Sequence, residues 1–401
     1  MSYRNYKNRE DIQIRKPVKR KKKTKAPKLP PIDKNLLTVV LLLIIFGIVA
    51  IWSASAPEGV ANFQNPLYYP LRHIFYAAIG FFCMRLTASI HYKKWEKWVD
   101  HVTFITIGLI VLTLVPGIGV TSYGASRWIN LGFIQLQPSE LAKFACILLV
   151  TTGICGHKSL WNPVAKKHML FVAIILGVIV LQPNMSMIIL LLTTMFGMLV
   201  VSGINMKIML PFALVAIPVL GYKIMHTGYQ SSRITGWLNP YADPQGAGYN
   251  IIQSWYAISS GGLLGVGLGN SKQKLYYLPV GYTDFVFSVI AEELGFIGIV
   301  GLIILFLFFI HFGFRVAIRC KDNFGKLLAF GIVFNIGSQA FINMCVASGV
   351  FPVTGVTLPL ISYGGSSLIA TFAMIGVLFN ISRYANKKEQ TQEIGQLQNA
   401  Q

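Results

Sequence analysis

The chain has 401 residues, of which 54% are hydrophobic and 12% charged, and its formal net charge at pH 7 is +21. Soluble domains carry about 25% charged residues, so this composition excludes an ordinary soluble globular protein. Repeated long apolar runs are typical of membrane-spanning helices, and we predict an all-α polytopic membrane protein.

The first segment, residues 1–34, holds thirteen Lys or Arg residues against three acidic residues. We predict a disordered tail, because the segment is highly charged and poor in apolar residues. A basic segment directly before a first membrane helix keeps that end in the cytoplasm and contacts anionic membrane lipids. This interpretation is favoured over nucleic-acid binding, and we expect no nucleic-acid partner.

Ten apolar segments follow the tail, and we predict about ten transmembrane helices. They lie near residues 36–54, 70–88, 101–117, 138–156, 168–183, 185–203, 206–225, 285–313, 325–347 and 366–383. Lys and Arg gather in every second loop, so the positive-inside rule places both termini in the cytoplasm. The predicted ten-span domain covers residues 35–385, and a cytoplasmic C-terminal tail covers 386–401.

Three long loops fall on the extracytoplasmic side of this topology. They cover residues 117–137, about 226–284 between the seventh and eighth spans, and 348–365. Long ordered loops are uncommon unless they have a function. We therefore expect the functional site to face the extracytoplasmic side of the plasma membrane.

Asp284 is the strongest catalytic candidate among the acidic residues on that side. It lies where the long loop re-enters the membrane, in "YTDFVF". An apolar boundary of this kind should raise the pKa of a carboxyl group toward the range that suits a general base. The alternative interpretation is a helix cap, formed by Thr283 or by Asp284 itself.

Glu140 has a structural interpretation. It follows Pro138, which suits the first position of a helix, and so falls in the first turn, where an acid favours the helix dipole. Lys143 lies one turn further on, within reach of an ion pair. We predict that Glu140 and Lys143 support the fold rather than react.

Glu292 and Glu293 lie two turns into the eighth predicted span. We expect them to pair with polar groups of a neighbouring helix, such as Gln339 or Asn343. Glu292 is about 12 Å along a helix from Asp284, beyond the separation of about 5–9.5 Å between paired glycosidase acids. A mechanism with a single base therefore fits better.

Sequence signatures of metal and nucleotide sites are missing. The chain has no H-E-x-x-H motif, and its five cysteines lack the spacing of a zinc site or a disulfide framework. The run "GGLLGVGLGNSKQK" (261–274) lacks the GK[ST] ending of a phosphate-binding loop. Its glycines favour tight packing of a re-entrant or interfacial segment instead.

Three blocks of sequence together resemble a known family. They are "GASRWINLGFIQLQPSELAKF" (124–144), "YNIIQSWYAISSGGLLGVGLGNSKQKLYYLPVGYTDFVFSVIAEELGFIG" (249–298) and "NMCVASGVFPVTGVTLPLISYGGSSLIA" (343–370). Over about residues 36–385 the chain is similar to the SEDS family of shape, elongation, division and sporulation proteins, typified by FtsW, RodA and SpoVE. The resemblance implies a peptidoglycan glycosyltransferase for cell division or elongation. Such an enzyme polymerises lipid II at the outer face, releases undecaprenyl pyrophosphate and works with a class B penicillin-binding protein.

The resemblance also implies site residues. It places the proposed catalytic acid of the family on Asp284, and Val280 and Tyr282 stand where the family usually has an acid and a histidine. Asn184 replaces an aspartate common in the family, which removes one negative charge. Among the expected substrate contacts, the matched motifs include Arg127, Trp128, Ser366 and Ser367. From their charge and their side of the membrane alone, we expect Arg127, Arg233, Lys272 and Lys274 to bind the pyrophosphate, directly or through a divalent ion such as Mg²⁺ or Mn²⁺. The alternative for each cation is a solvated side chain or an anchor to lipid headgroups.

Two other functions stay open at this point. One is a lipid II flippase, because a polytopic protein with intramembrane charges is compatible with a transport path. The other is a scaffold without catalytic activity that recruits a class B penicillin-binding protein. Polymerase activity of the purified protein would separate the enzyme from both alternatives.

Overall fold

The computed structural model describes residues 30–399 apart from 123–124, 131, 133–134, 156–159, 161, 206–213, 215–217, 219–220, 222–227 and 280. The predicted basic tail lies almost entirely outside these residues. So does most of the seventh predicted span, 206–225, together with Val280.

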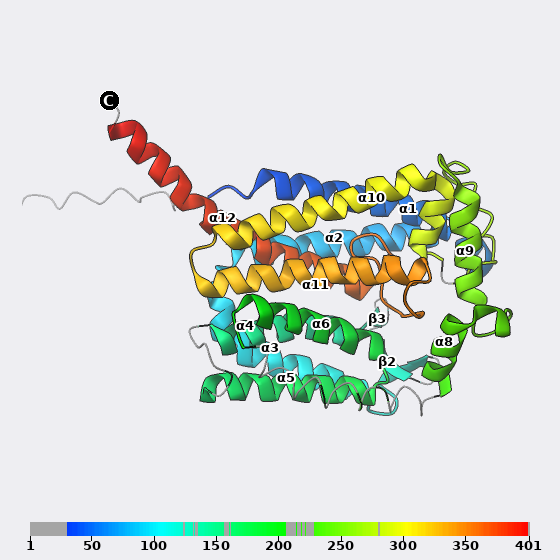
Figure 1. The fold of residues 1–401 in the computed structure, drawn as a ribbon, viewed down its shortest axis with the longest axis horizontal. Coiled ribbons are helices and arrows are strands. Elements are labelled where there is room, and N and C mark those ends of the chain that lie inside the picture. Colours follow the sequence, from blue (N-terminus) through cyan, green and yellow to red (C-terminus); the bar gives the residue numbers. More distant parts are fainter. Residues whose placement is uncertain are drawn as a thin grey trace, which may run out of the picture.

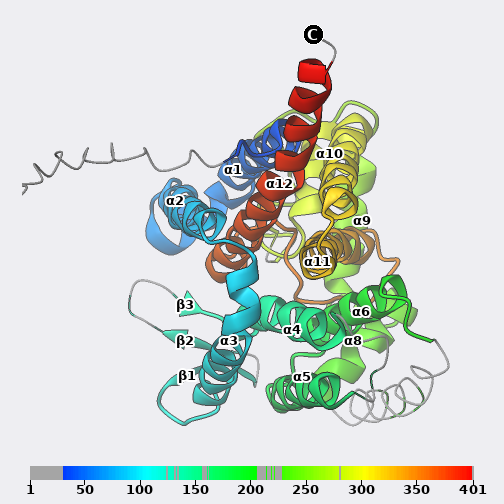
Figure 2. The same ribbon diagram turned by 90° about the vertical axis from the view of Figure 1, so that its left-hand side faces the viewer.

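Long helices lie side by side and form a bundle (Figure 1). Figure 2 views this bundle from one end. The helices of the bundle are α1 (Lys34–Phe63), α2 (Tyr68–Ser89), α3 (Lys93–Leu112), α4 (Pro138–Ile154), α5 (Pro163–Leu181), α6 (Met185–Val201), α10 (Val286–Arg319), α11 (Asn323–Ala347) and α12 (Gly365–Asn399). Helix α12 packs most extensively against α2. The predicted tail at 386–401 is thus helical up to Asn399.

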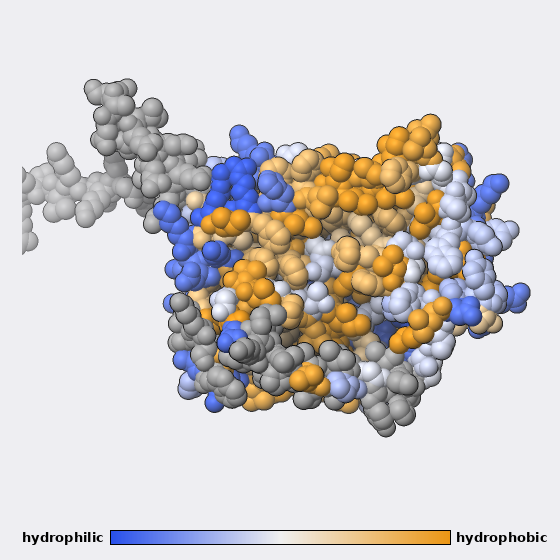
Figure 3. Space-filling view, viewed as in Figure 1, coloured by the Kyte–Doolittle hydropathy of each residue, from blue (hydrophilic) through white to orange (hydrophobic). Residues whose placement is uncertain are grey.

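The bundle has the surface of a multi-pass membrane protein. Apolar residues cover much of its middle, whereas hydrophilic residues gather toward its ends (Figure 3). Among the described residues, five helices are long and apolar enough to cross a membrane, namely α1, α5, α10, α11 and the part of α12 up to Ala385. The count of ten spans stays a prediction.

The two ends of the bundle differ. Helix α1 begins and α12 ends at the same end of the bundle (Figure 1). The opposite end carries α8 (Gly228–Leu238), α9 (Tyr249–Gly261) and a small sheet, and we call it the loop end. The 3₁₀-helix η1 (Pro240–Ala242) connects α8 to α9. Much of the predicted loop 226–284 is therefore helical.

The expectation of an all-α fold was incomplete, because the loop 117–137 forms an antiparallel sheet. Its strands are β1 (Gly119–Ser122), β2 (Ala125–Asn130) and β3 (Gln135–Leu136), in the order β1-β2-β3. The strands contain β-branched and aromatic residues, which favour extended backbone. Pairing them satisfies backbone hydrogen-bonding groups where the chain leaves the helices.

Helix α10 is interrupted at Gly295, whose φ of 65° and ψ of −164° are not helical. Residues of the loop after α9 fill the interruption, because Val266 N donates to Glu292 O at 3.0 Å. A Cβ atom on Gly265 would lie only 2.2 Å from Glu293 O. The glycine run at 261–274 therefore does permit the close packing that its sequence predicts.

Candidate active site

Asp284 lies at the loop end, in the turn before α10. The N-cap of α10 is Phe285, whose side chain makes no capping hydrogen bond. The N-cap position therefore falls on neither Thr283 nor Asp284, contrary to the alternative interpretation. Asn343 of α11 instead holds the backbone of this turn, because its Nδ2 donates to Asp284 O at 2.8 Å.

The surroundings of Asp284 suit a general base. Burial raises the pKa of its carboxyl to about 6, and the charge of Arg233 opposes this by lowering the pKa. The raised pKa agrees with the expectation from the sequence. A carboxyl with this pKa is ionised at neutral pH and more basic than an ordinary aspartate, so it can accept a proton from a hydroxyl group.

An extended segment, residues 352–357, lies beside the carboxyl of Asp284. A Cβ atom on Gly355 would be 3.8 Å from Asp284 Oδ2. Helix α11 holds this segment through Asn343, which donates to Val356 O at 2.8 Å, and through Gln339, which donates to Thr357 O at 2.9 Å. Asn343 thus fixes both the turn of Asp284 and the segment that faces it.

The predicted pair of Glu140 and Lys143 is present. Helix α4 begins at Pro138, and Lys143 Nζ lies 2.5 Å from Glu140 Oε2. Lys143 is fully buried and also donates to Gln339 Oε1 at 2.8 Å. The pair therefore connects α4 to α11 and, through Gln339, to the segment beside Asp284.

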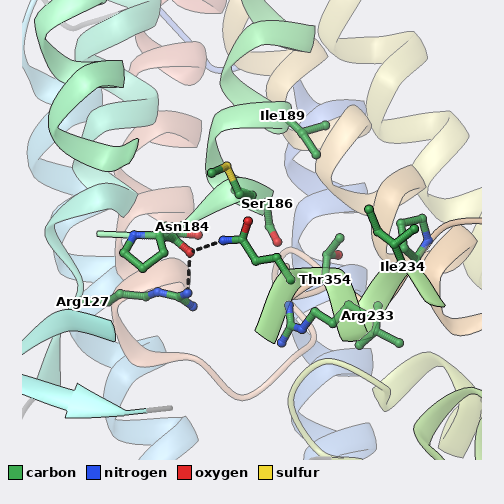
Figure 4. Close-up of a pocket in the computed structure, with 12 residues that line it drawn as sticks. Arg127, Asn184, Ser186, Ile189, Arg233, Ile234 and Thr354 are labelled. Carbon is green, nitrogen blue, oxygen red and sulfur yellow. Dashed lines mark hydrogen bonds between the residues drawn. The ribbon is translucent and has the colours of Figure 1, made fainter. Parts of the chain in front are cut away.

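Two arginine side chains face one cleft at the loop end (Figure 4). Arg127 comes from β2 and donates to Pro183 O at 2.7 Å, while Arg233 comes from α8. The cleft, which we call the arginine cleft, encloses about 510 Å³ including the solvent at its mouth. Two guanidinium groups beside one open cleft suit an anionic group such as a phosphate.

A smaller hollow, with about 260 Å³ of empty space including the solvent at its mouth, adjoins the arginine cleft. The two share Asn184 and Ser186 in their walls, and the segment 352–357 lines both. Glu140 and Gly355 belong to the smaller hollow. The arginine cleft and the smaller hollow together form a groove, which we call the loop-end groove. It extends from the two arginines to Gly355, the neighbour of Asp284.

Sequence reasoning missed Thr354 and Gln230, which line the arginine cleft. In the part of the chain that the structure describes, Thr354 Oγ1 and Gln230 Oε1 are buried without a hydrogen-bond partner. Buried polar atoms of this kind usually meet water or a ligand. Thr354 lies in the third block that resembles the family, but nothing in that block singles it out, and Gln230 lies outside all three blocks.

Lys274 is paired within the protein. Its Nζ lies 2.7 Å from Glu293 Oε1, and the two side chains are only 6% and 3% exposed. Ser53 of α1 joins the pair, because its hydroxyl donates to Glu293 Oε1 at 2.6 Å. Lys272 is exposed. Of these two predicted phosphate contacts, the structure therefore leaves only Lys272 facing solvent.

The expected partners of Glu292 and Glu293 were wrong. Glu292 accepts hydrogen bonds from Lys272 N at 2.9 Å and from the Ser271 hydroxyl. The interruption of α10 brings the loop 262–274 against these carboxylates, so this loop supplies the donors to Glu292 and the cation beside Glu293. Among the described residues, a neighbouring helix contributes through Ser53 of α1, which donates to Glu293. Gln339 and Asn343 bind the segment beside Asp284 instead.

Trp128, Ser366 and Ser367, which were expected to contact the substrate, are not among the described residues that line the groove. Trp128 is half-buried in β2. Ser366 donates to Gln135 O at 2.8 Å and so joins β3 to the start of α12. Ser367 accepts a hydrogen bond from Thr357 at 3.0 Å. The two serines thus hold the walls of the groove in place.

The structure offers no ready-made metal centre among its described residues. Within them, no three His, Cys, Asp or Glu side chains are grouped so that they could hold a metal ion. All five cysteines are free. A divalent ion would therefore need oxygen atoms of a substrate among its ligands.

Comparisons with known proteins agree on one family. The family profile of the FtsW/RodA/SpoVE cell cycle proteins matches residues 33–387. The chain is 40% identical over 353 residues to a probable peptidoglycan glycosyltransferase FtsW of Geobacter sp. (strain M18), covering 87% of this chain and 96% of that protein. It is 35% identical over 356 residues to stage V sporulation protein E of Bacillus subtilis, covering 88% of this chain and 97% of that protein.

Solved structures give the same result. A chain of a peptidoglycan synthase complex that coordinates polymerization and crosslinking superposes with a TM-score of 0.73 at 29% identity, covering 89% of this chain and 99% of that chain. The rod shape determining protein RodA of Thermus thermophilus superposes with a TM-score of 0.66 at 26% identity, covering 89% and 98%.

Proposed function

The chain belongs to the FtsW/RodA/SpoVE family of cell cycle proteins, and we propose that its loop-end groove polymerises lipid II into glycan strands. Its relatives at about 40% identity are named as peptidoglycan glycosyltransferases. The activity of this chain is that of a peptidoglycan glycosyltransferase. One observation supports this reaction most strongly: the Asp284 carboxyl, with a pKa of about 6, lies beside a groove with two arginines.

Asp284 acts as the general base. Its carboxylate takes the proton of the 4-hydroxyl group on the GlcNAc of the acceptor. The resulting oxygen nucleophile forms a bond to the anomeric carbon of the donor MurNAc. The bond from that carbon to the phosphate oxygen breaks, and its electron pair leaves with undecaprenyl pyrophosphate. A general base placed in this way contributes about 10²- to 10⁴-fold to the rate.

The arginine cleft holds the diphosphate of the donor. Arg127 and Arg233 supply charged donors for the negative charge that develops on the leaving group. Arg127 is itself positioned by the carbonyls of Gln182 and Pro183, at 3.2 and 2.7 Å. Lys272, exposed on the loop after α9, is a further phosphate contact. Lys274 has a structural role through Glu293.

A divalent ion, Mg²⁺ or Mn²⁺, fits this site through the oxygen atoms of the diphosphate. It would neutralise charge on the leaving group when bound. The proton transfer itself belongs to Asp284, and the two arginines orient the diphosphate.

The loop end faces the extracytoplasmic side of the membrane in this proposal, since lipid-linked sugars polymerise there. The positive-inside distribution of Lys and Arg supports this orientation. The partner is a class B penicillin-binding protein that crosslinks the strands. The similarity to a chain of a complex that coordinates polymerization and crosslinking supports this partnership.

Polymerisation of purified lipid II tests the proposal, with the wild-type protein and Asp284→Asn each combined with the partner transpeptidase. The substitution removes the base and keeps the size of the side chain and the backbone contact to Asn343. We expect glycan strands from the wild type and a loss of at least about 100-fold in the variant at an unchanged unfolding temperature. Equal activity of the two proteins would exclude Asp284 as the base. Inactivity of both would favour the flippase or the scaffold.

A further inference from the structure

Three tyrosine rings meet near Asp284, apart from the loop-end groove. Tyr69 of α2, Tyr282 and Tyr363 have ring centroids 4.8 Å (69–282), 5.3 Å (69–363) and 5.7 Å (282–363) apart. We call them the tyrosine triangle. Each of the three residues is only partly buried, so the triangle combines ring-to-ring packing with accessible surface.

The triangle is tied to the catalytic turn through the backbone. Tyr282 precedes Asp284 by two residues, and Tyr363 N donates to Tyr282 O at 3.0 Å. The carboxyl of Asp284 lies beside Gly355, which lines the groove. The turn of Asp284 therefore connects the triangle to the groove.

Different elements form the triangle and the arginine cleft. The triangle uses α2 and the segment before α12, whereas the cleft uses β2, the start of α6 and α8. Helices α2 and α8 lie on different sides of the bundle (Figure 2). A substrate held at the triangle therefore reaches Asp284 from another direction than a substrate held at the cleft.

Two polar side chains lie next to the triangle, His73 beside Tyr363 and Arg72 beside Tyr68, whose ring is 5.2 Å from that of Tyr69. His73 is buried, and its Nδ1 has no hydrogen-bond partner among the described residues. Its ring lies 6.3 Å from that of Tyr363. The Arg72 guanidinium lies 4.9 Å from the ring centre of Tyr68. A ligand at this place would meet aromatic faces together with hydrogen-bond donors and acceptors.

A belt of tyrosines at the membrane interface is the simpler explanation for such residues, because tyrosine is enriched there. Single, exposed side chains fit that explanation, as for Tyr256 (54% exposed), Tyr276 (59%) and Tyr277 (56%) at the same end of the molecule. The triangle differs, since its rings are partly buried and pack against one another. Its rings are also held by the turn that carries Asp284.

We propose that the tyrosine triangle binds the N-acetylhexosamine ring of the acceptor, whose hydroxyl group Asp284 deprotonates. The inference rests on the proposed function and adds the acceptor half of that site. A pyranose ring has an apolar C–H face that stacks on aromatic rings, and hydroxyl groups that need polar partners. The donor diphosphate occupies the arginine cleft, so the acceptor sugar approaches Asp284 from the triangle.

Tyr282→Leu is the decisive variant, because it removes the aromatic face and keeps much of the apolar volume. We expect the KM for lipid II to rise about tenfold while kcat stays within about twofold, as for a contact that binds substrate and transition state equally. Tyr282→Phe keeps the ring and should change KM less than about threefold. Polymerisation kinetics with the full-length protein and its partner transpeptidase give both constants.

A second readout does not depend on polymerisation. Saturation-transfer NMR with a soluble β-1,4-linked GlcNAc–MurNAc disaccharide reports contacts of the sugar protons with the detergent-solubilised protein. We expect transfer in the wild type and Tyr282→Phe, and none in Tyr282→Leu. Transfer in the wild type without any polymerisation would count against the proposed activity and not against the sugar site.

Tyr384→Leu is the matched control. Tyr384 is also partly buried in an aromatic cluster, with its ring 4.2 Å from that of His91. His91 follows the end of α2, whereas Tyr69 lies at the start of that helix. Tyr384→Leu should leave the KM for lipid II and the saturation transfer to the sugar unchanged. Unchanged KM and transfer in Tyr282→Leu, or equal losses in Tyr282→Leu and Tyr384→Leu, would overturn the inference and return the triangle to a packing or membrane-interface role.

Discussion

Acidic side chains lie in two regions at the start of α10, and their surroundings differ. In the turn before the helix, Asp284 is held through its backbone by Asn343, and its carboxyl has a raised pKa beside the groove. Two turns further on, Glu292 and Glu293 are buried and bonded through their carboxylates to the loop 262–274. The same class of side chain thus holds a loop in one region and lies beside a residue that lines the groove, Gly355, in the other.

The difference shows how to separate structural from catalytic acids near a membrane. A buried carboxylate that accepts hydrogen bonds from its own chain has satisfied its charge, and removing a partner destabilises the fold. A carboxyl positioned through its backbone keeps its oxygens available for a substrate. Location in or at the membrane does not by itself make this distinction.

The largest expected effect is a loss of stability, and it tests the region of Glu292 and Glu293. Lys274→Met leaves Glu293 buried without its cation, and we expect a loss of about 3–5 kcal/mol in the free energy of unfolding. Polymerase activity per folded molecule should be nearly unchanged, because Lys274 does not line the groove. Unfolding in detergent and activity at low temperature measure the two quantities.

Lys272→Met is the control for this prediction. Lys272 is exposed two residues away, so its loss should change the free energy of unfolding by no more than about 0.5 kcal/mol. The comparison between the two regions fails if Lys274→Met is as stable as Lys272→Met. It also fails if Lys274→Met abolishes the activity of molecules that remain folded.

Local relations in the sequence explain what could be predicted. Pro138, Glu140 and Lys143 lie within two turns of one helix, so their pairing follows from helix geometry. The apolar boundary around Asp284 is likewise local, and the direction of its pKa shift followed from it. The family resemblance supplied the role of Asp284 and the overall class of the protein.

Relations across the chain explain what could not be predicted. Ser53 and Glu293 are 240 residues apart, and no periodicity connects them. Because α10 is interrupted at Gly295, a loop supplies the hydrogen-bond partners of Glu292 that were expected from a helix. The sheet that holds Arg127 was assigned to a loop, because short strands between helices leave little pattern.

The second largest expected effect is the pH dependence of kcat/KM, which tests the region of Asp284. Only the ionised form of Asp284 accepts a proton, so kcat/KM should fall about tenfold per pH unit below about pH 6 and level off above it. The charge of Arg233 lowers this pKa. In Arg233→Gln the acidic limb should therefore move to higher pH, whereas Lys274→Met should leave it in place. A limb at the same pH in both variants would show that Arg233 does not act on the base.

The smallest expected effect comes from a glycine-to-alanine substitution, which can be made in both regions and compared. At Gly355 an added methyl group would meet Asp284 Oδ2 at 3.8 Å, an ordinary contact, so Gly355→Ala should change the free energy of unfolding by less than about 1 kcal/mol. The methyl group narrows the space beside the base, and we expect kcat to fall less than about tenfold.

Gly265 is the reference for that comparison, because its φ is +82° and an added Cβ would lie 2.2 Å from Glu293 O. Gly265→Ala must displace the loop from the interruption of α10, so it should lower stability far more than Gly355→Ala does. Unfolding temperatures and kcat of the two variants measure this. Equal losses of stability would mean that the segment beside Asp284 is packed as tightly as the loop at Glu292 and Glu293. The groove would then have no room for a sugar beside the base, and the catalytic assignment of this region would fall with it.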